Sequence, residues 1–97
     1  MGRVEMIKFL ANEALPKLAK ERGWPVTENH CFLRIAYDNL FGKCWYEVLT
    51  KKRPVLKQLD SDQVDKVIEI LKSIPDNLEE LNKKSLRFRK TYRCYSR

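Results

Sequence analysis

Three polar side chains recur at four-residue intervals inside an otherwise apolar segment. His30, Arg34 and Asp38 share one face if this segment is helical, because residues four apart are neighbours on a helix. An imidazole near a carboxylate can transfer protons close to neutral pH, so one interpretation is a small enzyme or ligand-binding protein centred on these residues, with Tyr37 assisting. The other is a buried polar network, because a charge inside a core must be paired.

We favour the network over the catalytic interpretation. A histidine near a helix start is more often structural or exposed than catalytic. In such a network Arg34 and Asp38 would bind one another or nearby backbone groups. The Arg-before-Asp order is the less favourable one for a pair within a helix, which also points to partners elsewhere in the fold.

The chain contains four potential zinc ligands, one histidine and three cysteines, but their spacing does not match that of zinc motifs. Zinc motifs pair their ligands two to four residues apart, whereas His30 and Cys31 are adjacent and leave a helix in different directions. The remaining cysteines, Cys44 and Cys94, are far away in the sequence. With three glycines in the chain there is no glycine-rich phosphate loop. We therefore expect no metal and no cofactor, and we favour a protein without catalysis while the enzyme centred on His30, Arg34 and Asp38 stays open as an alternative.

The charge of the chain is concentrated at its C-terminal end. Lys and Arg number 20 against 13 Asp and Glu, a formal net charge of +7. Residues 1–82 are balanced, whereas residues 83–97 carry seven basic side chains and no acidic one. On a helix the cations lie opposite the aromatic side chains, which is typical of a surface for phosphates. The candidate nucleic-acid contacts are Lys83, Lys84, Arg87, Arg89, Lys90 and Arg93, with Tyr92 and Tyr95 for stacking and Lys51, Lys52 and Arg53 as a second cluster.

We therefore expect a small binding module that contacts nucleic acid, mainly at its phosphates, through a basic C-terminal helix. Two other interpretations of the same residues stay open. Cations near a helix C-terminus are favoured by the helix dipole alone, so they can simply be solvated. They can also dock an acidic protein, which would make the chain a protein-interaction or assembly subunit.

Four helical segments position these residues. Apolar residues at three- and four-residue steps predict a helix over 4–22, kinked by Pro16 and ended by Gly23. A second helix over 27–49, capped by Thr27 and interrupted at Gly42, is apolar on nearly all sides. Such a helix is central, and in so short a chain it predicts a homodimer that covers it.

The last two helices are predicted from capping signals. Asp60 and Gln63 form a capping box, and Pro75 ends the helix that they begin. Asp76 and Glu79 repeat the pattern and open a helix that runs to about Tyr95. We expect one all-α domain over 1–97, a bundle of four to five helices, with 83–97 as a basic extension of the last one.

The sequence also favours one compartment. It contains no apolar run long enough for a transmembrane segment. An odd number of cysteines without a secretory leader indicates a reducing environment, so the expected location is cytoplasmic.

Overall fold

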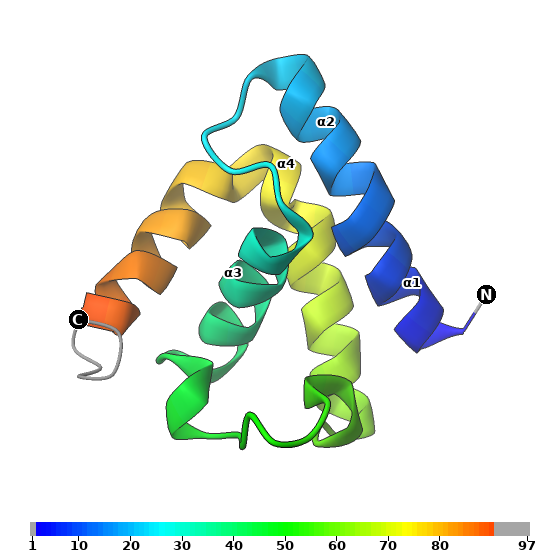
Figure 1. Cartoon of the computed structure of the whole chain (residues 1–97), viewed down its shortest axis with the longest axis vertical. Coiled ribbons are helices and arrows are strands. Elements are labelled where there is room, and N and C mark those ends of the chain that lie inside the picture. The colour runs from blue at the N-terminus through cyan, green and yellow to red at the C-terminus, as the bar shows by residue number, and fades with distance from the viewer. Residues whose placement is uncertain (1, 91–97) are drawn as a thin grey trace.

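The computed structural model describes residues 2–90, and all regular structure in that range is helical. This confirms the all-α prediction, but the described helices form three rods rather than four to five. The first rod is continuous and joins α1 (Arg3–Phe9), a π-helical turn η1 (Leu10–Ala14) and α2 (Leu15–Arg22). The others are α3 (Asn29–Phe41) and α4 (Ser61–Lys90), separated by two short 3-10 turns, η2 (Trp45–Glu47) and η3 (Val55–Lys57) (Figure 1).

The interruption expected from Pro16 is the π-helical turn η1. Pro16 has no N–H to donate to a carbonyl in the preceding turn, and η1 ends two residues before it. A π turn holds more residues than an α turn, so Ile7, Ala11, Leu15 and Ala19 all remain on the buried face at four-residue steps. Gly23 ends the rod in the left-handed conformation (φ 66°), as predicted.

Helix α3 lies at the centre of the molecule, as predicted. It begins one residue later than expected, with Glu28 rather than Thr27 as its N-cap, and it ends at Gly42 in the left-handed conformation (φ 68°). The piece expected after Gly42 is only the 3-10 turn η2. Phe32, Ile35 and Ala36 are buried within a single chain, so no second copy is needed to cover them.

Helix α4 is bent into two arms. Its start is the predicted capping box, because the Gln63 amide N–H donates to Asp60 Oδ1 (2.8 Å) and the Asp60 amide donates to Gln63 Oε1 (3.0 Å). Pro75 does not end the helix. The bend falls at Asn77, whose backbone is non-helical (φ −134°, ψ 20°). No cap by Asp76 occurs among the described hydrogen bonds, and Asn77 Nδ2 donates instead to the Ser73 carbonyl (3.3 Å).

The bend allows α4 to contact α3 with both arms. In Figure 1 the arms diverge as an inverted V with α3 between them, and the first rod lies along the outside of the N-terminal arm. That arm contributes Val67, Leu71 and Ile74 to the apolar core, which they share with Phe32 of α3 and Leu15 of the first rod. The C-terminal arm adds the partly buried Leu78 and Leu81 to this core, and it also contacts α3 through polar side chains. No helix in the described part of the chain is long and apolar enough to cross a membrane.

Candidate functional site

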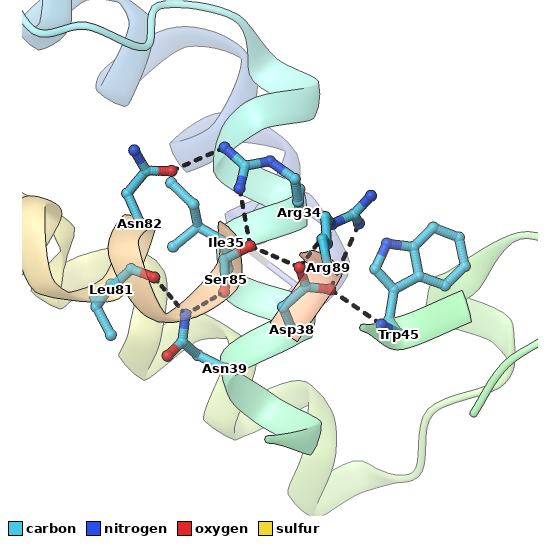
Figure 2. A network of polar contacts seen from close by, with 9 residues as sticks. All are labelled: Arg34, Ile35, Asp38, Asn39, Trp45, Leu81, Asn82, Ser85 and Arg89. Atoms are coloured by element: carbon cyan, nitrogen blue, oxygen red, sulfur yellow. Dashed lines mark hydrogen bonds and ion pairs between the residues drawn. The ribbon is translucent and has the colours of Figure 1, made fainter. Parts of the chain in front are cut away.

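The carboxylate of Asp38 is the centre of a buried polar network between α3 and the C-terminal arm of α4 (Figure 2). Arg89 Nε donates to Asp38 Oδ2 (2.8 Å), the Ser85 hydroxyl donates to the same oxygen (2.6 Å), and the Trp45 amide donates to Oδ1 (3.0 Å). Asp38 and Ser85 are fully buried, and Arg89 is 4% exposed. Three donors therefore stabilise one carboxylate that has no access to water.

Arg34 joins this network through Ser85 rather than through Asp38. Its guanidinium donates to Ser85 Oγ (2.8 Å) and to Asn82 Oδ1 (2.9 Å). Ser85 accepts from Arg34 while it donates to Asp38, so one hydroxyl connects the two residues that the sequence places one helical turn apart. Arg34 and Asp38 therefore do not bind one another directly, as one expectation had it, and their side chains find partners elsewhere in the fold, as the order of the two residues indicated.

The pKa of Arg89 reflects how fully the network compensates this charge. Burial alone would lower that pKa, but the hydrogen bonds from Arg89 to Asp38 and Tyr46, with the charge of Asp38, outweigh burial and raise it.

Asn39 adds a further contact between the helices, because its Nδ2 donates to the Leu81 carbonyl of α4 (3.0 Å). The network thus holds the C-terminal arm of α4 against α3.

This burial corrects one of the candidate nucleic-acid contacts. Arg89 was grouped with the cations that would meet phosphates, but its guanidinium is inside the protein and paired with Asp38. It serves as an anchor of the helix rather than as a surface charge. Of the other candidates, Lys83, Arg87 and Lys90 are exposed, and Lys84 pairs with Glu80 (3.3 Å) one turn earlier. Tyr92, Arg93 and Tyr95 lie outside the described residues.

The second basic cluster is held close to the end of α4 by an aromatic ring. Lys51 Nζ lies 4.0 Å from the centre of the Tyr46 ring, and Arg89 Cζ lies 4.7 Å from the same centre. The loop that carries Lys51, Lys52 and Arg53 is ordered by Gln58, whose Nε2 donates to the carbonyls of Thr50 (2.8 Å) and Arg53 (3.0 Å). All three cations of the cluster are exposed.

A pocket of about 270 Å³ opens beside the network. Two guanidinium groups and three aromatic rings contribute to its wall, and no acidic side chain does. The Tyr37 and Trp45 rings meet edge to face (5.9 Å between centres), as do those of Trp45 and Tyr46 (4.7 Å). Burial raises the pKa of Tyr37 to about 12, so its hydroxyl stays protonated at neutral pH. The lining residues are His30, Leu33, Arg34, Tyr37, Trp45, Tyr46 and Arg89.

The pocket brings together only part of the alternative site expected from the sequence. His30, Arg34 and Tyr37 line it, but Asp38 does not, because its carboxylate is enclosed by its three donors. The described contacts therefore include no pairing of His30 with Asp38 for acid–base chemistry. Cys44 is buried, and burial raises the pKa of its thiol, which disfavours the reactive thiolate.

Several residues of the site cannot be found by sequence reasoning about α3 alone. Asn82 and Ser85 are 48 and 51 residues from Arg34, so only the fold brings them to it. Trp45 and Tyr46 did carry a signal, since two large aromatic residues stand between a helix-ending glycine, Gly42, and the basic loop. Within residues 2–90, no group of three His, Cys, Asp or Glu side chains could hold a metal ion.

No protein-family model, no curated protein and no solved structure matches this chain.

Proposed function

We propose that the chain is a nucleic-acid-binding module whose C-terminal arm of α4 contacts phosphates without strong choice of sequence. The observation that carries the proposal is the distribution of charge on that arm. Lys83, Arg87 and Lys90 are exposed, and no Asp or Glu follows Glu80 in the chain. A row of cations without intervening acids attracts a polyanion and displaces its bound counterions.

The spacing of these cations suits a nucleic-acid backbone. Lys83, Arg87 and Lys90 are four and three residues apart, so they lie near one line along the helix. At about 1.5 Å per residue they extend over roughly 10 Å, which is the length of duplex axis occupied by about three phosphates of one strand at about 3.4 Å each. Contacts of this kind depend on charge and spacing rather than on bases.

The loop of Lys51, Lys52 and Arg53 extends the proposed surface. Tyr46 contacts both Lys51 of this loop and Arg89 of α4, so the loop lies close to the last turn of the described helix. Arg89 itself is not a phosphate contact in this proposal, because it is committed to Asp38. Its role is to hold the arm in place while its neighbours face outward.

A homodimer is not part of this proposal. The expectation of a dimer came from an apolar α3 in need of cover, and the apolar residues of α3 are covered by its own chain. Binding of an acidic protein would use the same cations, so only an experiment can distinguish it from nucleic-acid binding.

Fluorescence anisotropy with labelled single- and double-stranded oligonucleotides of random sequence tests the proposal. The variant Lys83→Gln/Arg87→Gln/Lys90→Gln removes three exposed charges from the proposed surface, and we expect its affinity to be at least about tenfold weaker at low salt. The matched control, Lys8→Gln/Lys17→Gln/Lys20→Gln, removes three exposed charges from the first rod. We expect the control to bind much more tightly than the α4 variant.

Two results would contradict the proposal. The first is that wild-type protein binds no oligonucleotide at about 50 mM salt, which would favour an acidic protein as the partner or solvated charges. The second is that both triple variants lose affinity equally, which would mean that net charge rather than the arm of α4 determines binding.

A further inference from the structure

The pocket beside the Asp38 network is lined by a positive charge, the guanidinium of Arg34, that no carboxylate of the network neutralises. Arg89 pairs with Asp38, the only carboxylate in the network. Arg34 has no carboxylate within ion-pair distance anywhere in residues 2–90, and its two hydrogen bonds go to the neutral groups of Ser85 and Asn82. The half-buried guanidinium of Arg34 therefore leaves one positive charge in excess at the pocket wall.

Arg34 also keeps donors for a ligand. A guanidinium has five N–H groups, and two of those of Arg34 are used by Ser85 and Asn82. The remaining three N–H groups have no partner among the described residues. These bonds to α4 also fix the orientation of the guanidinium before any ligand arrives, which lowers the cost of ordering it. A fixed guanidinium with free donors is well suited to a carboxylate.

The rest of the wall suits an aromatic body. The Trp45 ring contacts the rings of Tyr37 and Tyr46 edge to face, and the three side chains line a largely apolar hollow together with Arg34. A volume of about 270 Å³ lies just below the usual range of about 300–1,000 Å³ for pockets that hold drug-sized ligands, so the ligand is small.

We infer that this pocket binds a small aromatic monocarboxylate, with the carboxylate on Arg34 and the ring against Trp45. A single excess positive charge matches one negative charge, and a doubly charged phosphate monoester would bring one charge that no side chain of the network compensates. This inference does not depend on nucleic-acid binding, because the phosphate contacts proposed on α4 do not line the pocket.

The two tryptophans make the experiment internally controlled. Trp45 lines this pocket, whereas Trp24 lines a separate groove with Pro25 and Pro75. We would titrate ¹⁵N-labelled protein with 1-naphthoate and follow both indole N–H signals. The expected result is a saturable shift of the Trp45 signal without one at Trp24. The neutral analogue 1-naphthamide should bind at least about tenfold more weakly, because the charge-assisted hydrogen bonds are lost.

Variants then assign the affinity to Arg34. Arg34→Gln should remove the preference for naphthoate over naphthamide, and the same spectra report whether this variant is folded. The variant Lys83→Gln/Arg87→Gln/Lys90→Gln should bind naphthoate as the wild type does, even if nucleic-acid binding is absent altogether. The comparison of naphthoate with naphthamide uses wild-type protein, so the inference stays testable if Arg34→Gln does not fold.

Several outcomes would overturn the inference. One is the absence of any Trp45 shift at millimolar naphthoate, and another is equal affinity for naphthoate and naphthamide. Tighter binding of 1-naphthyl phosphate than of naphthoate would show that the monoanion assignment is wrong. Loss of naphthoate binding in the α4 triple variant would mean that the probe binds the basic surface instead.

Discussion

At the scale of single residues, Arg89 shows how one buried partner changes the role of a cation. By sequence it belongs to a basic tail, and adjacent exposed cations such as Lys90 support that grouping. The structure places it within a turn of Ser85 and against Asp38, on the inner side of α4. Leu81, Ser85 and Arg89 are spaced four residues apart, so on a helix they lie on the same side. Because Leu81 and Ser85 belong to the side that faces the protein, the same spacing is consistent with an inward Arg89.

Removing Arg89 should be far more damaging than removing an exposed cation. Arg89→Met leaves the Asp38 carboxylate buried without its ionic partner, and we expect a loss of about 3–5 kcal/mol in the free energy of unfolding. Arg3→Met is the control, because the pair of Arg3 with Asp65 is half exposed and should contribute less than about 1 kcal/mol. Urea denaturation measures both, and equal losses would show that the Asp38 network does not stabilise the fold.

Tyr37 gives the fold a dependence on alkaline pH. Its pKa is about 12 in the folded protein against about 10 in the unfolded chain, because burial disfavours the phenolate. The unfolded chain therefore ionises first, so this contribution to stability is complete below about pH 10 and is lost between about pH 10 and 12. The loss amounts to about 1.5–3 kcal/mol.

The variant Tyr37→Phe isolates this contribution. It cannot ionise, so its free energy of unfolding should fall less steeply than that of the wild type between about pH 10 and 12. Urea denaturation of both proteins from neutral to alkaline pH gives the comparison. Parallel curves across that interval would contradict the assignment to Tyr37.

At the scale of elements, local signals predicted the structure where neighbouring residues determine it. The capping box of Asp60 and Gln63 and the left-handed cap at Gly23 depend on a few consecutive residues, and both were found where predicted. Gly42 interrupts the helix as expected, and it does so as a second left-handed cap. The break expected at Pro75 falls two residues later, at Asn77, and it is a bend rather than an end of the helix. Helical backbone resumes after a single non-helical residue, Asn77, because the contacts of the C-terminal arm with α3 hold the chain there.

The capping box gives a prediction for α4. Asp60→Ala removes the acceptor of the Gln63 amide and should lower the free energy of unfolding by about 1 kcal/mol. Asp62→Ala is the matched control, because it removes an exposed carboxylate from the same turn that caps no backbone amide among the described contacts. Thermal or urea denaturation measures both variants, and an equal effect would mean that charge near the helix start, not the hydrogen bond, is what stabilises α4.

Contacts between distant elements could not be predicted in the same way. Arg34 and Asp38 were recognised as residues in need of partners, since unpaired charges inside a helix core are costly. The identity of their partners depends on the bend of α4 and on the register of α4 against α3. Neither feature can be predicted from the sequence of a few neighbouring residues. The candidate polar residues were thus found from the sequence, but their geometry and the pocket beside them were not.

At the scale of the whole molecule, the Asp38 network lies between two features with different chemistry, the exposed cations of the C-terminal arm of α4 and the pocket on Arg34. The outward side of the C-terminal arm carries exposed cations, whereas the inward side is fixed to α3 by Asp38 and Ser85. The pocket on Arg34 is lined by different residues from the cations proposed to meet phosphates. The two proposals can therefore fail independently.

The central claim, that the outward cations of α4 contact phosphates, is tested most directly by the salt dependence of oligonucleotide binding. Each phosphate contact contributes about 0.7 to 0.9 to the slope of the logarithm of the binding constant against that of the salt concentration. From about 50 to 200 mM salt, we expect Lys83→Gln/Arg87→Gln/Lys90→Gln to have a slope shallower than that of wild type by about 2 to 3. An unchanged slope would contradict the claim, because the three side chains would then release no counterions.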